Sequence, residues 1–301
     1  MSQRVSLSAL VLILLIVAAT PARAGMPVPM PPGSGPRIYA QHLLERALGT
    51  HPGVLLLGMH VAPPGKGRNE IIASNFGRIG KPADRDDLHV IASGQAKLEI
   101  NKQGNRFEVE LPLENMIGTT VGALSVVFPY RPGEDRAALG RQAFAIRDAL
   151  RRHILTLKNL FDPYPFVADP PPDDTLAQKL VDETLDAHPH LLVIGIHVTP
   201  PGATRNVIVA SNFGRIGKPA DGDDMSVVTS GKPKLELNAD GKRYEVELWL
   251  LDRAGKSVGA VSFVFPYRKG ENPQVLLRRA EHLRDALRAR IPSRAALLAR
   301  S

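Results

Sequence analysis

The 301-residue chain contains no cysteine. This absence excludes disulfides, thiolate nucleophiles, cysteine-ligated zinc, iron–sulfur clusters and a lipid anchor on a processed N-terminal cysteine. Aromatic residues are scarce, at 5%, and beyond residue 24 no apolar run reaches the roughly 20 residues that span a membrane. Hydrophobic residues still make up 44% of the chain, so it is predicted to fold, and its length predicts two domains.

The first 24 residues have the pattern of a cleavable signal peptide. Arg4 provides a positive charge, Leu7 to Ala19 is apolar, and Ala22-Arg23-Ala24 supplies the small residues of a cleavage site. An uncleaved membrane anchor is the alternative, but the run is too short to span a bilayer, and Pro and Gly soon follow. We therefore expect a mature protein that is periplasmic or secreted, with no transmembrane segment after processing.

The chain has 38 basic and 30 acidic side chains, which gives a formal charge of +8. The basic residues are interspersed with acidic ones, as in Arg85-Asp86-Asp87 and Arg284-Asp285, and form no block. Because nucleic-acid binding uses a concentrated basic surface, we expect no nucleic-acid partner.

The chain consists largely of one domain written twice. His51-Pro52 recurs as His188-Pro189, and this offset of 137 residues relates 40–154 to 177–291 without a gap, with 65 identities in 115 positions. Two copies joined by a proline-rich connector predict two tandem domains, because a solenoid requires three or more repeats. The expected boundaries are a signal peptide at 1–24, a Pro/Gly-rich tail at 25–37, repeat 1 at 38–158, a linker at 159–173 and repeat 2 at 174–293.

Hydrophobic periodicity predicts the same elements in both repeats. In repeat 1, helices are expected at 38–48, 84–91 and 139–154, and strands at 54–61, 70–74, 97–101, 106–113 and 120–128. The first two strands should be neighbours, and the next two should form a hairpin. Along the fourth strand, Phe107, Val109 and Leu111 would point inward, and the alternating residues Arg106, Glu108 and Glu110 would point outward. The fold class is therefore α+β, with a five-stranded antiparallel sheet flanked on one face by N- and C-terminal helices.

This element order resembles that of the PAS-like extracytoplasmic sensor modules called Cache domains. The closing strands, which start with Gly118 to Gly122 and Gly255 to Gly259 and continue with apolar residues, are similar to the last strands of that family. The resemblance implies two tandem PAS/Cache-like domains, each with a ligand cavity walled by the helical excursion after the second strand. It also implies a separate output partner, such as an envelope receptor or a kinase, because no output module is present in the chain.

The longest identical segment is Ala73 to Asp84, which recurs as Ala210 to Asp221. We predict that this block contacts a small polar or anionic ligand. Its arginine would hold a carboxylate or phosphate bidentately, its lysine would add charge, and its asparagine would donate and accept hydrogen bonds. These candidate ligand-binding residues are Asn75, Arg78 and Lys81 in repeat 1, and Asn212, Arg215 and Lys218 in repeat 2. Because the segments are identical, the repeats should bind with similar affinity.

The block also has a purely structural interpretation. Gly77 and Gly80 would allow a positive φ, Asp84 would cap the following helix, and Arg78 would pair with an acidic residue of the first turn. The spacing from Gly77 to Lys81 lacks the length and the Ser or Thr of a phosphate-binding loop. At the level of sequence both interpretations stay open.

His60 and His197 occupy matching positions near the end of the first strand, and Tyr130 and Tyr267 follow the last one. The histidines are predicted to face away from the core and to contact the ligand, and the tyrosines to line the pocket. A structural role is the alternative for each of them. The histidines could also ligate a metal with the nearby aspartates, but these lack a calcium-loop pattern, and we predict neither a metal nor another cofactor.

No nucleophile elbow, His-Glu-x-x-His helix, Walker loop or dinucleotide-binding glycine pattern is present in the sequence. We therefore predict a binding protein and not an enzyme. The leading hypothesis is an exported tandem PAS/Cache-like sensor that binds a small molecule and acts through a separate partner. The alternative is a ligand-free protein–protein interaction module of the cell envelope.

Overall fold

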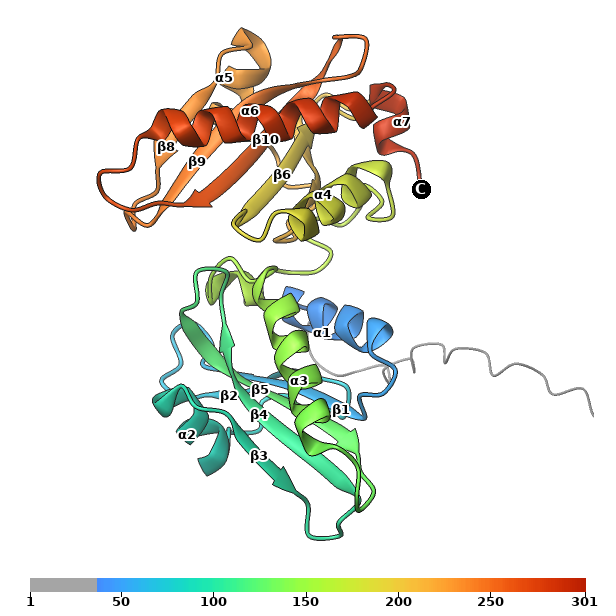
Figure 1. Ribbon diagram of the computed structural model, residues 1–301. Coiled ribbons are helices and arrows are strands. Elements are labelled where there is room, and N and C mark those ends of the chain that lie inside the picture. Colours follow the sequence, from blue (N-terminus) through green and yellow to red (C-terminus); the bar gives the residue numbers. More distant parts are fainter. Residues whose placement is uncertain (1–36) are drawn as a thin grey trace, which may run out of the picture.

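The computed structural model describes residues 37–301, so the predicted signal peptide and all but the last residue of the predicted tail lie outside it. None of the helices in this range is both long and apolar enough to cross a membrane. The described chain forms two lobes, one for each repeat, which are joined by the linker (Figure 1). Each lobe is α+β, as the sequence predicts.

Repeat 1 contains three α-helices and five strands in the predicted order. Their bounds are α1 Tyr39–Thr50, β1 Leu56–Val61, β2 Glu70–Ser74, α2 Arg85–Ser93, β3 Lys97–Ile100, β4 Arg106–Glu114, β5 Thr120–Pro129 and α3 Arg136–Arg151. A short 3-10 helix, η1 (Lys158–Phe161), follows. All the predicted elements exist, and only their ends are shifted by a few residues.

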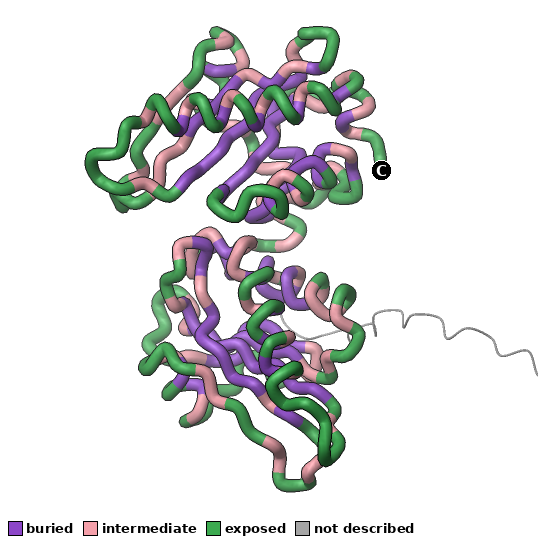
Figure 2. The backbone as a smooth tube through the Cα atoms, viewed as in Figure 1, coloured by how far each residue is buried: buried purple, intermediate pink, exposed green. Residues whose placement is uncertain are grey.

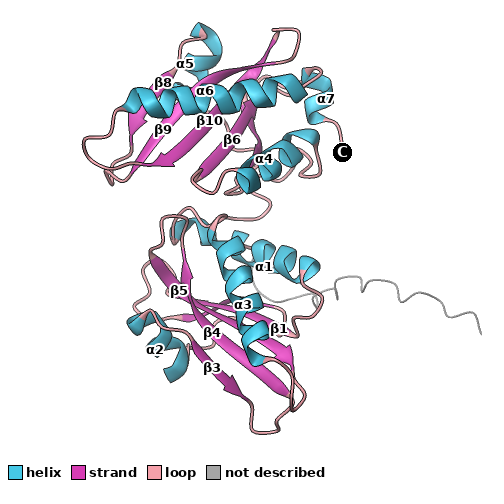
Figure 3. Ribbon diagram, viewed as in Figure 1, coloured by secondary structure: helices cyan, strands magenta, loops and turns pink. Residues whose placement is uncertain are grey.

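The five strands form one antiparallel sheet in the order β2-β1-β5-β4-β3. β1 pairs with β2 and β3 pairs with β4, which confirms both predicted neighbours. The long helices α1 and α3 pack on one face of the sheet, whereas α2 contacts β4 and β5 from the other face (Figure 3). The N- and C-terminal helices therefore flank one face, as predicted, and α2 covers the other face, which carries the polar residues of β1 and β4.

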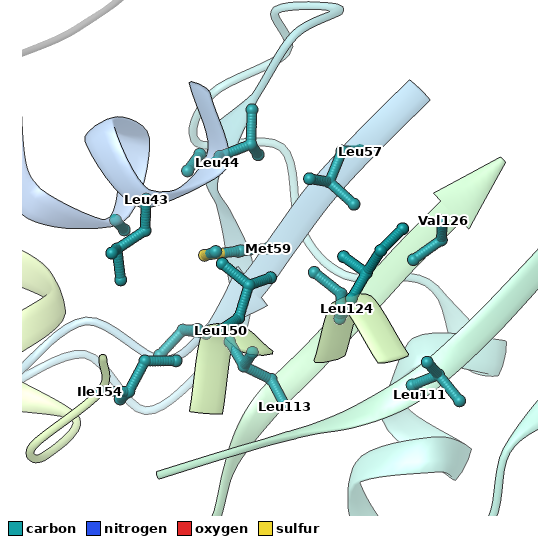
Figure 4. Close-up of a cluster of buried hydrophobic side chains, with 14 of the residues drawn as sticks. Leu43, Leu44, Leu57, Met59, Leu111, Leu113, Leu124, Val126, Leu150 and Ile154 are labelled. Atoms are coloured by element: carbon teal, nitrogen blue, oxygen red, sulfur yellow. The ribbon is translucent and has the colours of Figure 1, made fainter. Parts of the chain in front are cut away.

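The hydrophobic core of repeat 1 lies between the sheet and the helices α1 and α3 (Figure 4). Phe107, Val109 and Leu111 lie in this core, as predicted. Figure 2 shows the same division in both lobes, with mostly buried strands and exposed outer faces of the long helices. Gly122 in β5 allows the strands to approach, because a Cβ there would lie 2.3 Å from the His60 carbonyl oxygen on β1.

Repeat 2 has the same architecture with one addition. Its elements are α4 Leu176–Ala187, β6 Val193–Val198, β7 Val207–Ser211, α5 Gly222–Ser230, β8 Lys234–Leu237, β9 Arg243–Leu251, β10 Ser257–Pro266, α6 Pro273–Arg290 and α7 Arg294–Leu298. The sheet order is β7-β6-β10-β9-β8. Helix α7 lies beyond the expected end of the repeat, yet it contacts α4 and buries Leu297 in the core. Repeat 2 therefore extends past residue 293.

Candidate functional site

The repeated block connects β2 to α2, and its small and acidic residues set its conformation. Gly77 and Gly80 adopt positive φ angles of 74° and 84°, which glycine tolerates without strain. Arg78 also has a positive φ, 63°, a conformation that is uncommon outside glycine and is often found at functional sites. The Asp84 side chain accepts hydrogen bonds from two backbone N–H groups of the first turn of α2, as the capping prediction requires.

Asn75 anchors the block to the neighbouring strand. Its side-chain oxygen accepts a hydrogen bond from the Leu57 N–H at 2.9 Å, and its amide donates to the Leu55 carbonyl at 3.0 Å. Both polar ends of the side chain therefore have partners within the protein. This arrangement gives Asn75 a role in positioning the block against β1.

A cavity of about 350 Å³ lies beside the block in repeat 1. It brings together three of the predicted ligand-binding residues, His60, Arg78 and Lys81. The full lining is Leu56, His60, Ile71, Phe76, Arg78, Lys81, Asp84, Arg106, Glu108, Glu110, Ser125 and Val127. Because side chains of both charges converge on this space, it suits a small polar molecule better than an apolar one.

Beneath α2 the sheet face carries a buried histidine–carboxylate pair. His60 Nδ1 lies 2.6 Å from Asp87 Oδ2, and these residues are only 8% and 1% exposed. His60 faces away from the hydrophobic core, as strand alternation predicts. The pair recurs in repeat 2, where His197 Nδ1 lies 3.1 Å from Asp224 Oδ2. Burial opposes ionisation of Asp224, yet its pKa is lowered by the hydrogen bond and charge of His197, by a backbone N–H and by the charge of Lys218.

Glu110 on β4 completes this polar layer. The residue is 8% exposed, and its Oε2 atom has no hydrogen-bond partner among the described residues. Burial, followed by the charges of Asp87, Asp84 and Glu108, raises the pKa of Glu110 to about 8. Glu247 occupies the same position in repeat 2, and burial followed by neighbouring carboxylates raises its pKa to about 8 as well.

Glu110 points away from the core, as predicted, but it is buried, because α2 covers the sheet face to which this side chain points. A signal for a site was present in the sequence. Glu110 and Glu247 are related by the repeat offset, and Glu108 and Glu245 are related in the same way. Acidic residues repeated on a strand that lies near a repeated histidine would have indicated a polar site on this face.

Tyr130 and Tyr267 lie away from the polar layer. The Tyr130 ring is centred 6.1 Å from the Phe107 ring, and the Tyr267 ring 5.3 Å from the Tyr244 ring. These contacts are on the core side of each sheet. The structure therefore does not bring either tyrosine to the histidine of its repeat, and both have the packing role that was the alternative.

In repeat 2 the block lies against repeat 1. The Asn212 side chain donates to the Arg152 carbonyl at 2.7 Å, and the Asn212 carbonyl accepts a hydrogen bond from His153 Nδ1 at 2.9 Å. Arg215 Nε donates to Asp162 Oδ2 at 2.7 Å. Arg215 thus binds a carboxylate, but this carboxylate belongs to the chain itself.

Apolar contacts extend the interface between the repeats. Three side chains of repeat 1, which we call the plug, pack into one cluster with repeat 2: Met116, Ile117 and Leu155. The plug meets a surface that we call the head surface, which comprises Leu192, Phe213, Arg215 and Ile216 in repeat 2 and, by the repeat offset, Leu55, Phe76, Arg78 and Ile79 in repeat 1.

The head surface is closed in repeat 2 and open in repeat 1. Leu192 and Ile216 are each 8% exposed, whereas Leu55 and Ile79 are 40% and 36% exposed. The identical blocks therefore have different surroundings. Sequence identity alone is then no reason to expect both repeats to bind a ligand with similar affinity.

A larger hollow, of about 710 Å³, lies between the linker and repeat 2. Prolines and aliphatic residues form most of its wall, and Asp169 and Arg205 are its charged residues. Because few polar groups converge there, we place the candidate site in the smaller cavity beside His60.

Comparison with known protein families and with curated proteins finds no match to this sequence. Solved structures offer a distant likeness. A GAF sensor protein from Burkholderia vietnamiensis is 11% identical over 55% of this chain and 95% of its own, with a TM-score of 0.31. PelD from Pseudomonas aeruginosa is 15% identical over 86% of this chain and 79% of its own, with a TM-score of 0.30.

A third similar structure is the extracellular domain of a histidine kinase. It is 11% identical over 75% of this chain and 80% of its own, with a TM-score of 0.21. With TM-scores of 0.21 to 0.31, these likenesses are too low to carry a ligand, a role or an activity over to this chain.

Proposed function

We propose that the chain is an exported sensor-type binding protein, not an enzyme, and that the cavity of repeat 1 takes a small polar ligand with an anionic group. The observation that carries the proposal is the cavity of about 350 Å³ beside His60. Arg78, Lys81 and Arg106 supply positive charge there, next to the carboxylates of Asp84, Glu108 and Glu110. This volume is at the lower end of the range for small-molecule pockets. The predicted signal peptide supports a periplasmic or secreted location, and a separate envelope receptor or kinase would carry the output.

Repeat 1 is the binding lobe in this proposal because its arginine is exposed. Arg78 lines the cavity and faces solvent, whereas Arg215 is paired with Asp162. An arginine already bound to a carboxylate would have to give up that partner before it could hold a ligand. We therefore expect one ligand per chain.

A thermal-unfolding screen of the chain without its signal peptide tests the proposal. The compounds would be carboxylates, phosphates, nucleotides, purines and amines, and a ligand at 100 times its Kd stabilises by about 2.7 kcal/mol. Arg78→Ala should abolish the shift, whereas Arg215→Ala should keep it on a less stable background. No shift with any class, or a shift that survives Arg78→Ala, would contradict the proposal.

A second function, protein–protein interaction, is favoured by the open head surface. In repeat 2 the same surface binds a protein segment that supplies the apolar plug and the Asp162 carboxylate. The occupant of the open surface in repeat 1 would be a different protein with the same chemistry: two or three clustered aliphatic side chains next to a carboxylate for Arg78.

Another copy of this chain, stacked end to end, lacks that chemistry. At the positions of the plug, repeat 2 carries Arg253, Ala254 and Pro292. A charged Arg253 in the place of Met116 would be desolvated against the head surface, which disfavours open-ended stacking.

Installing the plug in repeat 2 tests whether the open head surface is competent for binding. The variant Arg253→Met with Ala254→Ile should associate in a concentration-dependent way in sedimentation velocity experiments. Adding Ile79→Asp should return it to the monomer. A variant that stays monomeric at high concentration would contradict this second function.

A further inference from the structure

Three carboxylates converge in the polar layer of each repeat. In repeat 1 they belong to Asp84, Asp87 and Glu110, and one oxygen of each lies within 4.8 Å of the others. Asp221, Asp224 and Glu247 form the same cluster in repeat 2. The aspartates come from the N-terminus of a short helix and the glutamate from a strand of the sheet, so two separate elements build each cluster.

The helix cap accounts for only part of these carboxylates. Asp84 Oδ1 accepts the first-turn N–H groups, and Asp87 Oδ2 accepts the Asp84 N–H and faces His60 Nδ1. Asp87 Oδ1 and Glu110 Oε2 have no hydrogen-bond partner among the described residues, although the residues are only 1% and 8% exposed. Glu247 Oε2 in repeat 2 is buried and unpartnered in the same way.

Buried carboxylate oxygens without partners are costly, and three carboxylates at this separation repel one another when ionised. His60 contacts the cluster through Asp87, and Glu108 adds a further negative charge from β4. Lys97 on β3 pairs with Asp86 and Glu99 instead. The cationic side chains of Arg78, Lys81 and Arg106 line the same cavity as Asp84 and Glu110.

The geometry points to a site for a hard divalent cation, such as Mg²⁺, Ca²⁺ or Mn²⁺, held by Asp84, Asp87 and Glu110 in repeat 1 and by Asp221, Asp224 and Glu247 in repeat 2. Carboxylate oxygens are the ligands that these ions prefer, and such ions commonly keep several waters. The exposed aspartate at each helix cap gives the ion a route from solvent.

His60 and His197 have a positioning role at this site. A ligating carboxylate is usually oriented by a neighbouring polar group, and Nδ1 of each histidine faces an oxygen of the aspartate, at 2.6 Å in repeat 1 and 3.1 Å in repeat 2. The ring thereby orients Asp87 or Asp224 with its other oxygen toward the ion. The sequence predicted no metal and offered ligation by these histidines only as an alternative, whereas the geometry assigns the ligand role to the carboxylates.

This site goes beyond the proposed function, because it recurs in both repeats and needs neither the cavity ligand nor an open head surface. The probe is therefore the ion alone. Titration of the metal-free full chain with Mn²⁺, followed by the electron paramagnetic resonance signal of free Mn²⁺, gives the number of bound ions directly. The expected stoichiometry is two per chain.

Glutamine variants keep the size of the glutamate side chain and remove its charge, so we expect the fold to be retained. Circular dichroism checks this. Glu110→Gln should lower the stoichiometry from two ions to one, and Glu110→Gln with Glu247→Gln should remove binding. The matched control is Glu99→Gln, a carboxylate of β3 that is exposed and lies outside the cluster. It should leave two sites with unchanged affinity.

Competition with Mg²⁺ and Ca²⁺ checks the class of ion. Because the histidines are not ligands in this proposal, His60→Gln should weaken Mn²⁺ binding less than Glu110→Gln does. Absence of Mn²⁺ binding at millimolar concentration would overturn the inference. So would a stoichiometry that does not change in the folded Glu110→Gln and Glu247→Gln variants. If Mn²⁺ does not bind but the ligand screen succeeds, the cation site is wrong and the proposed function stands. If Mn²⁺ binds and no ligand does, the cation site stands and the proposed function is wrong.

Discussion

Repeats 1 and 2 carry the same block of sequence, from Ala73 to Asp84 and from Ala210 to Asp221, in two different environments. In repeat 2 the block and its apolar neighbours are covered by the plug and by polar groups of repeat 1 and of the linker. In repeat 1 the corresponding head surface is open to solvent. Identical residues can thus stabilise the protein in one copy and be available for binding in the other.

The comparison also separates two layers of the block. The helix caps, the histidine–aspartate pairs and the clustered carboxylates are the same in both repeats. The outer side chains differ in what they touch: Arg215 binds Asp162, and Arg78 lines a cavity. Features of the inner layer should therefore behave alike in the two repeats, and features of the outer layer should not.

The largest difference between the repeats is expected at the isoleucines of the head surface. Ile216→Asp places a charge in the interface and should lower the free energy of unfolding by about 3 kcal/mol. Ile79→Asp lies on the open surface and should change it by less than about 0.5 kcal/mol. Urea unfolding of both variants measures the difference, and equal losses would show that repeat 2 is not covered.

Glycine substitutions should give the next largest difference. Gly77 and Gly214 have nearly the same positive φ, 74° and 73°, so Gly→Ala should cost about 1 kcal/mol of backbone strain at either position. At Gly214 a Cβ would also lie 2.7 Å from the Tyr39 ring, whereas at Gly77 no atom lies within 4 Å. We expect Gly214→Ala to cost about 2 kcal/mol more than Gly77→Ala in thermal unfolding.

The arginines should show a smaller difference. Arg215→Ala removes the ion pair with the mostly buried Asp162 and should cost about 1 kcal/mol. Arg78→Ala should leave the stability unchanged and affect only ligand binding. Chemical denaturation of the two variants under the same conditions tests this, and an equal loss of stability for both would argue against the assigned pairing.

The smallest difference is expected in the polar layer, where burial raises the pKa of Glu110 and of Glu247 to about 8. In the unfolded chain each carboxyl has an ordinary pKa, so the folded chain binds more protons between about pH 4.5 and 8. In metal-free buffer the stability contributed by these protons is fully present below the unfolded pKa and is lost as the pH rises toward 8.

Glu110→Gln and Glu247→Gln should each flatten this pH dependence by a similar amount, of at most about 1.4 kcal/mol per pH unit. Thermal unfolding at several pH values in a chelator measures the slope. A slope that is unaffected by both substitutions, or affected by only one, would contradict the equivalence of the two polar layers.

Much of this architecture follows from the sequence. The repeat offset, the alternation along β4 and the capping pattern at Asp84 predict the elements and their order, because they depend on local periodicity and local hydrogen bonds. The burial of Glu110 was missed, because it depends on where α2 packs, and its short amphipathic pattern does not specify which face of the sheet it covers.

The candidate site was predictable in part for the same reason. His60, Arg78 and Lys81 were expected to lie together, and they line one cavity. The separate environments of Arg78 and Arg215 were not predictable from identical sequences. They arise from contacts between residues that are far apart in the sequence, such as Arg215 and Asp162. Such contacts depend on how the two repeats pack together.

The absence of cysteine makes one measurement especially direct. Single-cysteine variants Ile79→Cys and Ile216→Cys place the same thiol at equivalent positions of the two head surfaces, and the labelling rate with a thiol reagent reports its access to solvent. We predict that the thiol at 79 reacts at close to the rate in denaturant, and that the thiol at 216 reacts at least about tenfold more slowly in the folded chain. Equal rates at the two positions would contradict the claim that one head surface is closed and the other open.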